Sequence, residues 1–143
     1  NGESCGNIQF IGSDIKSCDV PAHMIPSIID EIPILAVIAV FAEGKTIFYE
    51  VEELRFKECD RLDAIIKNLQ LFGINAYEEE NNLVVEGGKP TKMAKILSFD
   101  DHRIAMAFII LSIVAFKEYH IDNTDCINIS LPGFFNILKD IQR

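Results

Sequence analysis

The most informative stretch of this chain is EELRFKECDRL, residues 52–62. It follows a strand-like run and precedes a helical one, so it forms the corner between two elements. Lys57, Glu58, Asp60 and Arg61 place two cations and two carboxylates within five positions of that corner. This density is typical of a site that binds an anion and moves a proton. The alternative is a set of ordinary surface ion pairs at helical spacing.

The residues after the corner predict a helix and then a hairpin. Apolar side chains recur on one helical face, at Leu62, Ile65, Ile66, Leu69 and Phe72. Gly73 follows as a helix stop. Two short runs then predict the strands of a hairpin, Ala76 to Glu79 and Leu83 to Glu86, and Glu80-Asn81-Asn82 predicts the turn between them.

The same order of elements occurs twice, at a spacing of about 71 to 73 residues. The first half predicts a strand, an acidic turn, an apolar helix and a strand before the corner: Asn7 to Ile11, Asp30-Glu31, Ile32 to Ala42 and Thr46 to Val51. The second half predicts the matching strand, turn, helix and strand, then a corner and a last helix: Leu83 to Glu86, Asp100-Asp101, Ile104 to Phe116, Tyr119 to Asp122, Cys126 to Ser130 and Leu131 to Ile141.

Alternating strands and helices at this period predict an α/β fold of duplicated units. The first unit covers about residues 1–86 and the second about residues 83–143, with the connecting hairpin shared. The second unit has no hairpin of its own, so it is two strands short. Those strands come from elsewhere in a longer chain, or a sheet edge stays exposed. The first residue is Asn1 rather than Met, which also indicates a piece of something longer.

Length and charge limit the function classes. The 143 residues suffice for one ordinary domain, and the net charge of −9 disfavours nucleic acid and anionic membranes as partners. The apolar runs Ile32 to Ala42 and Ile104 to Phe116 are shorter than the ~20 residues of a membrane span. Four scattered cysteines without CxxC spacing predict reduced thiols in a cytoplasmic protein, rather than a zinc site or a disulfide framework.

Charged clusters stand at three predicted helix starts: Asp30-Glu31, Lys57 to Arg61 and Asp101-His102-Arg103. A helix start offers free N–H groups and a partial positive charge, and arginine binds carboxylates or phosphates through two bonds. If the repeats stack in register, these starts line one pocket for an anionic substrate. Taken singly, Asp30 and Asp101 are also explained as N-caps, and His102-Arg103 as a satisfied hydrogen-bonding pair.

Four segments resemble the C-terminal third of the EPSP synthases, the 3-phosphoshikimate 1-carboxyvinyltransferases of the shikimate pathway. They read IIDEIP (28–33), FAEGKT (41–46), EELR with KECDR (52–61) and DHRIAMA (101–107). The resemblance implies a two-domain enzyme built from βαβαββ units that form inside-out α/β barrels. This chain would supply about two units of the C-terminal domain, with the last incomplete. The N-terminal domain of the same polypeptide would be the missing partner.

The resemblance also implies a role for each matching residue. Asp30 binds the 5-hydroxyl of shikimate 3-phosphate and acts as its base, and Glu58 donates the proton to the methylene of phosphoenolpyruvate. Lys57 lies between the two substrates. Phosphoenolpyruvate is held by Arg61 and Arg103, with His102 beside them. The reaction adds the hydroxyl to the protonated enolpyruvyl group and then eliminates phosphate, so neither a metal nor an organic cofactor is implied.

The chain departs from the family pattern at two places. Cys59 stands where Ser or Thr is usual, which weakens a helix cap more than the chemistry. The corner Cys126 to Ser130 lacks the lysine that many members use for phosphoenolpyruvate. Two other functions remain open: a carboxyvinyltransferase for UDP-N-acetylglucosamine, and a binding module that has lost catalysis. Because the resemblance places the rest of the enzyme outside this chain, the chain by itself is expected to be inactive.

Overall fold

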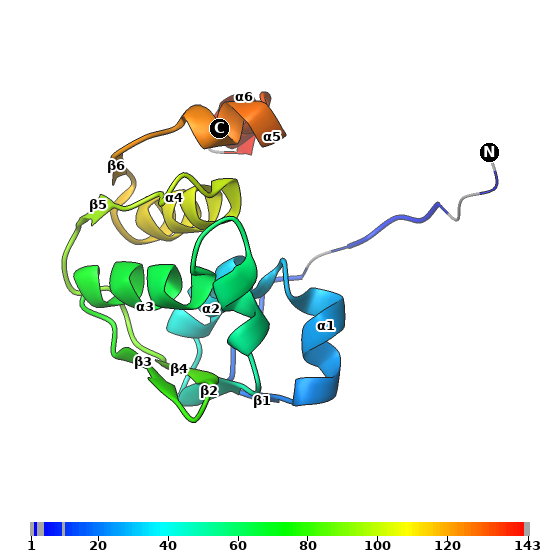
Figure 1. Ribbon diagram of the computed structural model, residues 1–143. Helices are drawn as coiled ribbons and strands as arrows, with labels where there is room; N and C mark the ends of the chain where they lie inside the picture. Colours follow the sequence, from blue (N-terminus) through cyan, green and yellow to red (C-terminus); the bar gives the residue numbers. More distant parts are fainter. Residues whose placement is uncertain (1, 3–4, 10, 142–143) are drawn as a thin grey trace.

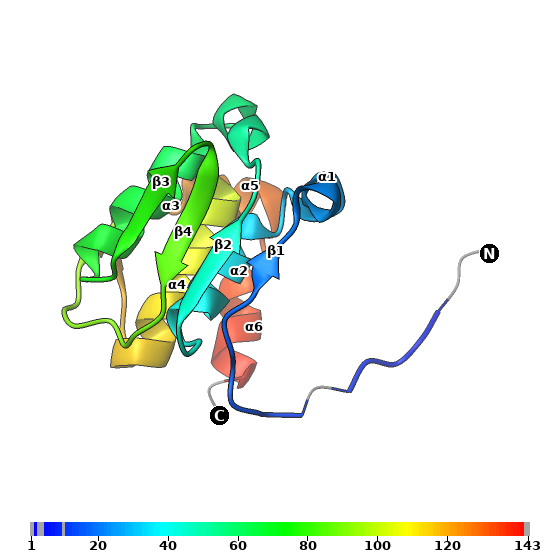
Figure 2. The same cartoon turned by 90° about the horizontal axis from the view of Figure 1, so that it is seen from below.

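The structure is a computed structural model that describes residues 2, 5–9 and 11–141. Its main sheet has four strands in the order β1-β2-β4-β3, with helices behind one face (Figure 2). The strands are β1 (Asp19–Val20), β2 (Lys45–Phe48), β3 (Ala76–Glu79) and β4 (Asn82–Glu86). β1 and β2 are parallel, whereas β4 is antiparallel to both β2 and β3. A second sheet consists of β5 (Lys95–Ile96) and β6 (His120–Ile121), which are parallel.

The helices stack outward from the main sheet in layers (Figure 1). Short helices, η1 (Ala22–Met24) and α1 (Ile25–Ile28), lead from β1 into α2 (Ile32–Val40). A 3-10 segment, η2 (Glu52–Phe56), precedes α3 (Arg61–Leu71), and α4 (His102–Phe116) packs on α2 and α3. The outermost layer holds α5 (Asp125–Ser130) and α6 (Phe134–Ile141). The core between these layers is aliphatic and aromatic, with Phe72 stacked against Phe108 and Phe116.

Most predicted elements are present, because their local signals agree with the packing. The predicted helices over residues 32–42, 62–72 and 104–116 correspond to α2, α3 and α4. The amphipathic face of α3 is buried, including Leu62, Ile65 and Leu69. Gly73 ends that helix with φ of 80°, a conformation that suits glycine. The hairpin prediction is confirmed by β3 and β4, which turn through Glu80 and Asn81.

Two strand predictions are wrong. Residues 7–9 and 11 of the strand predicted over Asn7 to Ile11 belong to no strand, and residue 10 lies outside the described residues. Residues 15–20 run beside 43–49 instead, from the Lys16–Glu43 bridge into β1. The first strand of the second half is β5 rather than Leu83 to Glu86, because β4 is fully used between β2 and β3. The predicted hairpin therefore lies in the first sheet.

The last part of the chain also differs from the prediction. Residues Cys126 to Ser130, expected as a corner, are helical in α5, where the backbone N–H of Asp125 donates to Asn123 Oδ1. The following helix begins at Phe134 rather than Leu131. Leu131 leaves the helical region, with φ of −140° and ψ of 77°, because that region is disfavoured for the residue before a proline, here Pro132.

The two sheets have the same core arrangement, a parallel pair joined through an apolar helix. In the first, α2 connects β1 with β2, and in the second, α4 connects β5 with β6. Among the residues that the structure describes, the second sheet has no counterpart of β3 and β4. No single helix in this part of the chain is long and apolar enough to cross a membrane; segments 22–28 and 32–40 meet that criterion only as a pair bent by 115°.

Candidate active site

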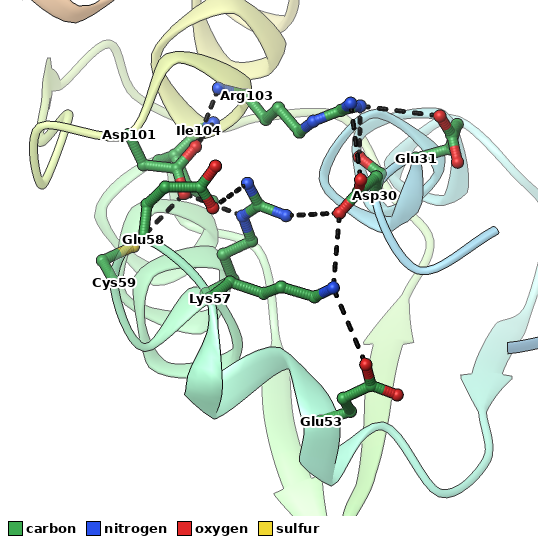
Figure 3. A network of polar contacts seen from close by, with 10 residues as sticks. Asp30, Glu31, Glu53, Lys57, Glu58, Cys59, Asp101, Arg103 and Ile104 are labelled. Carbon is green, nitrogen blue, oxygen red and sulfur yellow. Dashed lines mark hydrogen bonds and ion pairs between the residues drawn. The ribbon is translucent and has the colours of Figure 1, made fainter. Parts of the chain in front are cut away.

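The charged site is assembled from three segments that are distant in sequence. Asp30 lies in the turn before α2, Lys57 and Glu58 lie in the corner after η2, and Arg61 is the first residue of α3. His102 and Arg103 begin α4. The contact between α2 and α4 and the contact between α3 and α4 bring these segments together (Figure 3).

Arg61 is the centre of the site. Its side chain is 1% exposed, and each of its nitrogens donates to a carboxylate. Nε bonds Asp101 Oδ2 at 2.7 Å, Nη1 bonds Asp30 Oδ1 at 2.9 Å, and Nη2 bonds Glu58 Oε2. Burial alone would lower the pKa of Arg61, but the hydrogen bond and charge of Asp101 outweigh it and raise the pKa. The guanidinium is therefore a permanent buried cation that organises three carboxylates.

Asp30 is the carboxylate on which the cations converge. Lys57 Nζ lies 3.6 Å from Asp30 Oδ1, and Arg103 Nη2 lies 3.5 Å from Oδ2. Arg103 Nη1 also donates to the backbone oxygen of Asp30 at 2.9 Å. Partial burial raises the pKa of Asp30, but the hydrogen bond from Arg61 and the charges of Arg103 and Lys57 lower it more, so the net pKa falls below its ordinary value of 3.8. The group is a carboxylate at neutral pH.

The helix-cap interpretation is correct for one of the two aspartates. Asp101 is the N-cap of α4, and its Oδ1 accepts from the N–H groups of Arg103 and Ile104. Asp30 is not a cap, because Glu31 occupies the residue before α2 and makes no side-chain cap bond. Asp60, in contrast, caps α3 by accepting from the N–H of Asp63.

Several side chains at the edge of the site have supporting contacts. Glu53 approaches Lys57 Nζ at 3.7 Å, and Glu31 Oε1 accepts from Arg103 Nη1 at 3.5 Å (Figure 3). His102 is half-buried at the start of α4, next to Asp101 and Arg103 of this network. Burial and the neighbouring Asp101 raise the pKa of the Cys59 thiol to about 12, so this cysteine is an inert neighbour rather than a nucleophile.

A pocket of about 270 Å³ opens beside the cluster. Asp30, Glu31 and Arg103 form its polar side. Its apolar wall comes from α2, α4 and the α5–α6 connection: Pro33, Ile34, Met106, Ala107, Ile110, Leu131 and Phe134. Among the described residues, no group of three or more His, Cys, Asp or Glu side chains has a metal-binding arrangement.

The sequence located Asp30, Lys57, Glu58, Arg61 and Arg103, and the structure brings all five together. It placed Asp101 and Glu31 in charged clusters at helix starts without giving either a role in the site, and it did not single out Glu53. The signal for Asp101 was only its position before an apolar helix. That position predicts that one carboxylate oxygen of Asp101 caps the helix. It does not predict that the other oxygen, Oδ2, accepts a hydrogen bond from Arg61.

Fold and site together define an α/β protein in which cations from the corner after η2 and from the starts of α3 and α4 gather around Asp30. The model of the EPSP synthase (3-phosphoshikimate 1-carboxyvinyltransferase) family matches residues 6–138. The chain belongs to the EPSP synthase family.

Individual relatives agree over nearly the whole chain. It is 46% identical over 145 residues to a 3-phosphoshikimate 1-carboxyvinyltransferase of Clostridium tetani, covering 100% of this chain and 33% of the relative. A protein of the same name from Oceanobacillus iheyensis is 44% identical over 142 residues, covering 99% of this chain and 33% of the relative. The solved EPSP synthase from Acinetobacter baumannii superposes with a TM-score of 0.82 at 30% identity, covering 89% of this chain and 30% of that one. The chain thus spans about a third of the length of its relatives.

Proposed function

We propose that this chain forms part of the active site of a 3-phosphoshikimate 1-carboxyvinyltransferase. The complete enzyme would move the enolpyruvyl group of phosphoenolpyruvate to the 5-hydroxyl of shikimate 3-phosphate. The observation that carries the proposal is the convergence of Lys57, Arg61 and Arg103 on Asp30, with Glu58 on the same guanidinium. In a chain of net charge −9, the partly exposed Lys57 and Arg103 are the cations of this cluster that can meet an anionic substrate.

The reaction requires two carboxyl groups with opposite tasks, one protonated to give a proton and one ionised to take a proton. Glu58 gives a proton to the methylene carbon of phosphoenolpyruvate, and the neighbouring carbon becomes electron-poor. The 5-hydroxyl oxygen attacks that carbon while Asp30 takes the hydroxyl proton. Loss of a proton from the new methyl group and departure of phosphate then restore the double bond. The low pKa of Asp30 supports its role as the carboxylate that binds and orients the hydroxyl.

The cations divide into an exposed pair and a buried one. Lys57 is 23% exposed and Arg103 is 34% exposed, so both can reach a substrate from their present positions. Lys57 would lie between the two substrates, and Arg103, with His102 beside it, would hold phosphoenolpyruvate. Three of the five N–H groups of Arg61 already bond carboxylates, and its side chain is 1% exposed, so phosphoenolpyruvate can contact Arg61 only if Asp30 or Glu58 shifts to uncover it.

The rest of the enzyme would come from the same polypeptide. Because the relatives are about three times as long, we infer that an N-terminal domain forms the other wall of the site and that missing strands complete the second unit. Two βαβαββ units, the last incomplete, remain the proposed division of this chain within the C-terminal domain. Cytoplasmic location and cofactor-free catalysis also remain predictions.

A hybrid enzyme tests the function directly. This chain would replace the third of the C. tetani relative that it matches, and transfer from phosphoenolpyruvate to shikimate 3-phosphate would be measured. We expect turnover in the hybrid and its loss in Glu58→Gln, since the amide cannot donate the proton. Arg103→Ala should mainly raise the KM for phosphoenolpyruvate.

The control is Glu79→Gln at the exposed end of β3, which should retain turnover. A near wild-type kcat in Glu58→Gln would show that Glu58 is not the proton donor. Transfer to UDP-N-acetylglucosamine instead of shikimate 3-phosphate would show that the chain belongs to an enzyme for the nucleotide sugar. A correctly folded hybrid without either activity would favour a noncatalytic module.

A further inference from the structure

Asp101 connects two helix starts through a single carboxylate. Its Oδ2 accepts from Arg61 Nε at 2.7 Å, at the first residue of α3. Its Oδ1 accepts from the backbone N–H of Arg103 at 2.8 Å and of Ile104 at 3.3 Å, in the first turn of α4. One rigid planar group therefore fixes the distance between the helix that carries Arg61 and the helix that carries Arg103 (Figure 3).

A helix cap alone does not account for this arrangement. Asp60 performs the same capping task on α3 and also binds an arginine, Arg55, but its side chain is 40% exposed. The Asp101 side chain is 0% exposed and its partner Arg61 is 1% exposed. Burying a carboxylate is unfavourable unless it is paired and fully hydrogen-bonded, whereas serine would satisfy the cap without that cost. The buried charge thus serves the contact with Arg61.

The backbone before Asp101 is held in an unfavourable conformation. Phe99 and Asp100 are consecutive non-glycine residues with φ of 51° and 55°. Side chains disfavour this left-handed region, so such residues persist where the surrounding structure holds them. Here the N–H of Ser98 donates to Asp122 Oδ1 at 2.9 Å, and Asn123 Nδ2 donates to Asp100 Oδ1 at 3.1 Å. The end of β6 therefore anchors the turn that presents Asp101.

Through its other contacts, Arg61 also fixes the positions of the proposed reacting groups. Nη1 of Arg61 holds Asp30, and Nη2 holds Glu58. Arg103, whose backbone N–H is fixed by Asp101, reaches Asp30 from the other side. A movement of Asp101 would therefore displace both arginines and, through them, both carboxylates.

We propose that Asp101 is a positioning residue of the carboxyvinyl transfer site: it sets Arg61, and through it Asp30 and Glu58, relative to Arg103. The expected change in KM and kcat rests on the proposed function. The expected displacement of Arg61 and Arg103 does not, and it can be measured separately. The chemical role of Asp101 is indirect, because its side chain is fully buried and cannot meet a substrate in this arrangement.

The experiment compares Asp101→Ser with Asp60→Ser in the hybrid enzyme. Serine can cap both helices, so each variant loses chiefly one arginine contact: Arg61 in the first and Arg55 in the second. We expect Asp101→Ser to raise the KM for phosphoenolpyruvate at least about 10-fold and to lower kcat, because small displacements of reacting groups are costly. Asp60→Ser should change both values less than about threefold. The kinetics are measured under conditions in which circular dichroism shows that all variants are folded.

A second readout uses hybrid protein labelled with ¹⁵N-arginine. Asp101→Ser should shift the Nε–H signals of both Arg61 and Arg103 and speed exchange of the Arg61 proton, whereas Asp60→Ser should leave them in place. Asp101→Asn, a closer match in shape, provides the same comparison if the serine variant fails to fold. Wild-type signals for both arginines in the folded Asp101 variants would overturn the proposal, as would wild-type KM and kcat. An inactive hybrid would count against the proposed function alone, because the arginine signals still decide the role of Asp101.

Discussion

Arg61 illustrates how tertiary contacts define the role of a residue. In the sequence it is one cation in a dense corner, equally compatible with a surface ion pair. In the folded chain it is almost fully buried between Asp101, Asp30 and Glu58. Removing one member of a buried charge cluster leaves the others uncompensated. Its primary task is therefore to hold the carboxylates, and any contact with substrate is added to that task.

The lowered pKa of Asp30 predicts a defined pH dependence of stability. A carboxyl whose pKa is lower in the folded state stabilises the fold above its unfolded pKa, and this contribution is lost as pH falls through the folded value. The difference in unfolding free energy between wild type and Asp30→Asn should therefore be present at neutral pH and shrink below about pH 4. Urea titrations across this range provide the measurement.

Asp14→Asn, at an exposed position of the N-terminal segment, is the matched control. It should follow the wild-type pH curve throughout. A difference for Asp30→Asn that stays constant down to pH 2 would mean that its carboxylate does not interact with Lys57, Arg61 and Arg103 as the geometry indicates.

At the scale of elements, Asn68 joins α3 to the second half of the chain. The side chain is fully buried, and it pairs with both backbone groups of Leu97, the residue after β5. Its Nδ2 also donates to Ala64 within α3. A polar residue on the buried face of an amphipathic helix thus adds hydrogen bonds between the two halves to the packing of α4 on α2 and α3.

Asn68→Leu keeps the volume of the side chain but leaves the N–H and C=O of Leu97 without a partner. An unpaired buried polar group costs about 1–3 kcal/mol, so we expect the free energy of unfolding to fall by at least that amount. Asn75→Leu is the control, since Asn75 is exposed and its side chain donates to the side chain of Glu86 rather than to a backbone group. Equal stability of the two variants would contradict the linking role of Asn68.

At the scale of the whole molecule, the apolar helices remain partly uncovered. Ile38 on α2 is 42% exposed and Val114 on α4 is 52% exposed, although both helices are apolar over most of their length. The second sheet has two strands among the described residues, whereas the first has four. Both features agree with a chain that spans a third of the length of its relatives.

The 143-residue chain alone should therefore lack carboxyvinyl transfer and bind both substrates weakly. Isothermal titration with phosphoenolpyruvate and with shikimate 3-phosphate, alongside a phosphate-release assay, measures this directly. The hybrid enzyme is the positive control, because it supplies the remaining two thirds. Turnover by the isolated chain at a rate near that of the hybrid would contradict a site divided between two parts of the polypeptide.

The sequence by itself determined the elements whose signals are local. The apolar period of α3, its glycine stop, the hairpin and the repeated apolar helices all follow from neighbouring residues. The charged corner and the segment from Asp101 to Ala107 also carried enough information to indicate the family and five of the clustered site residues. These features depend on backbone propensity and residue type, which a sequence states directly.

The tertiary structure decided what depends on partners distant in sequence. Strand pairing selected residues 15–20 over residues 7–9 and 11 as the neighbour of β2, and β5 over β4 as the first strand of the second sheet. Packing of α3 against α4 buried Arg61 and made Asp101 its partner across 40 positions. Burial changes the cost of a charge, and burial arises only when separate elements meet. The roles of Arg61 and Asp101 therefore emerge from the folded chain.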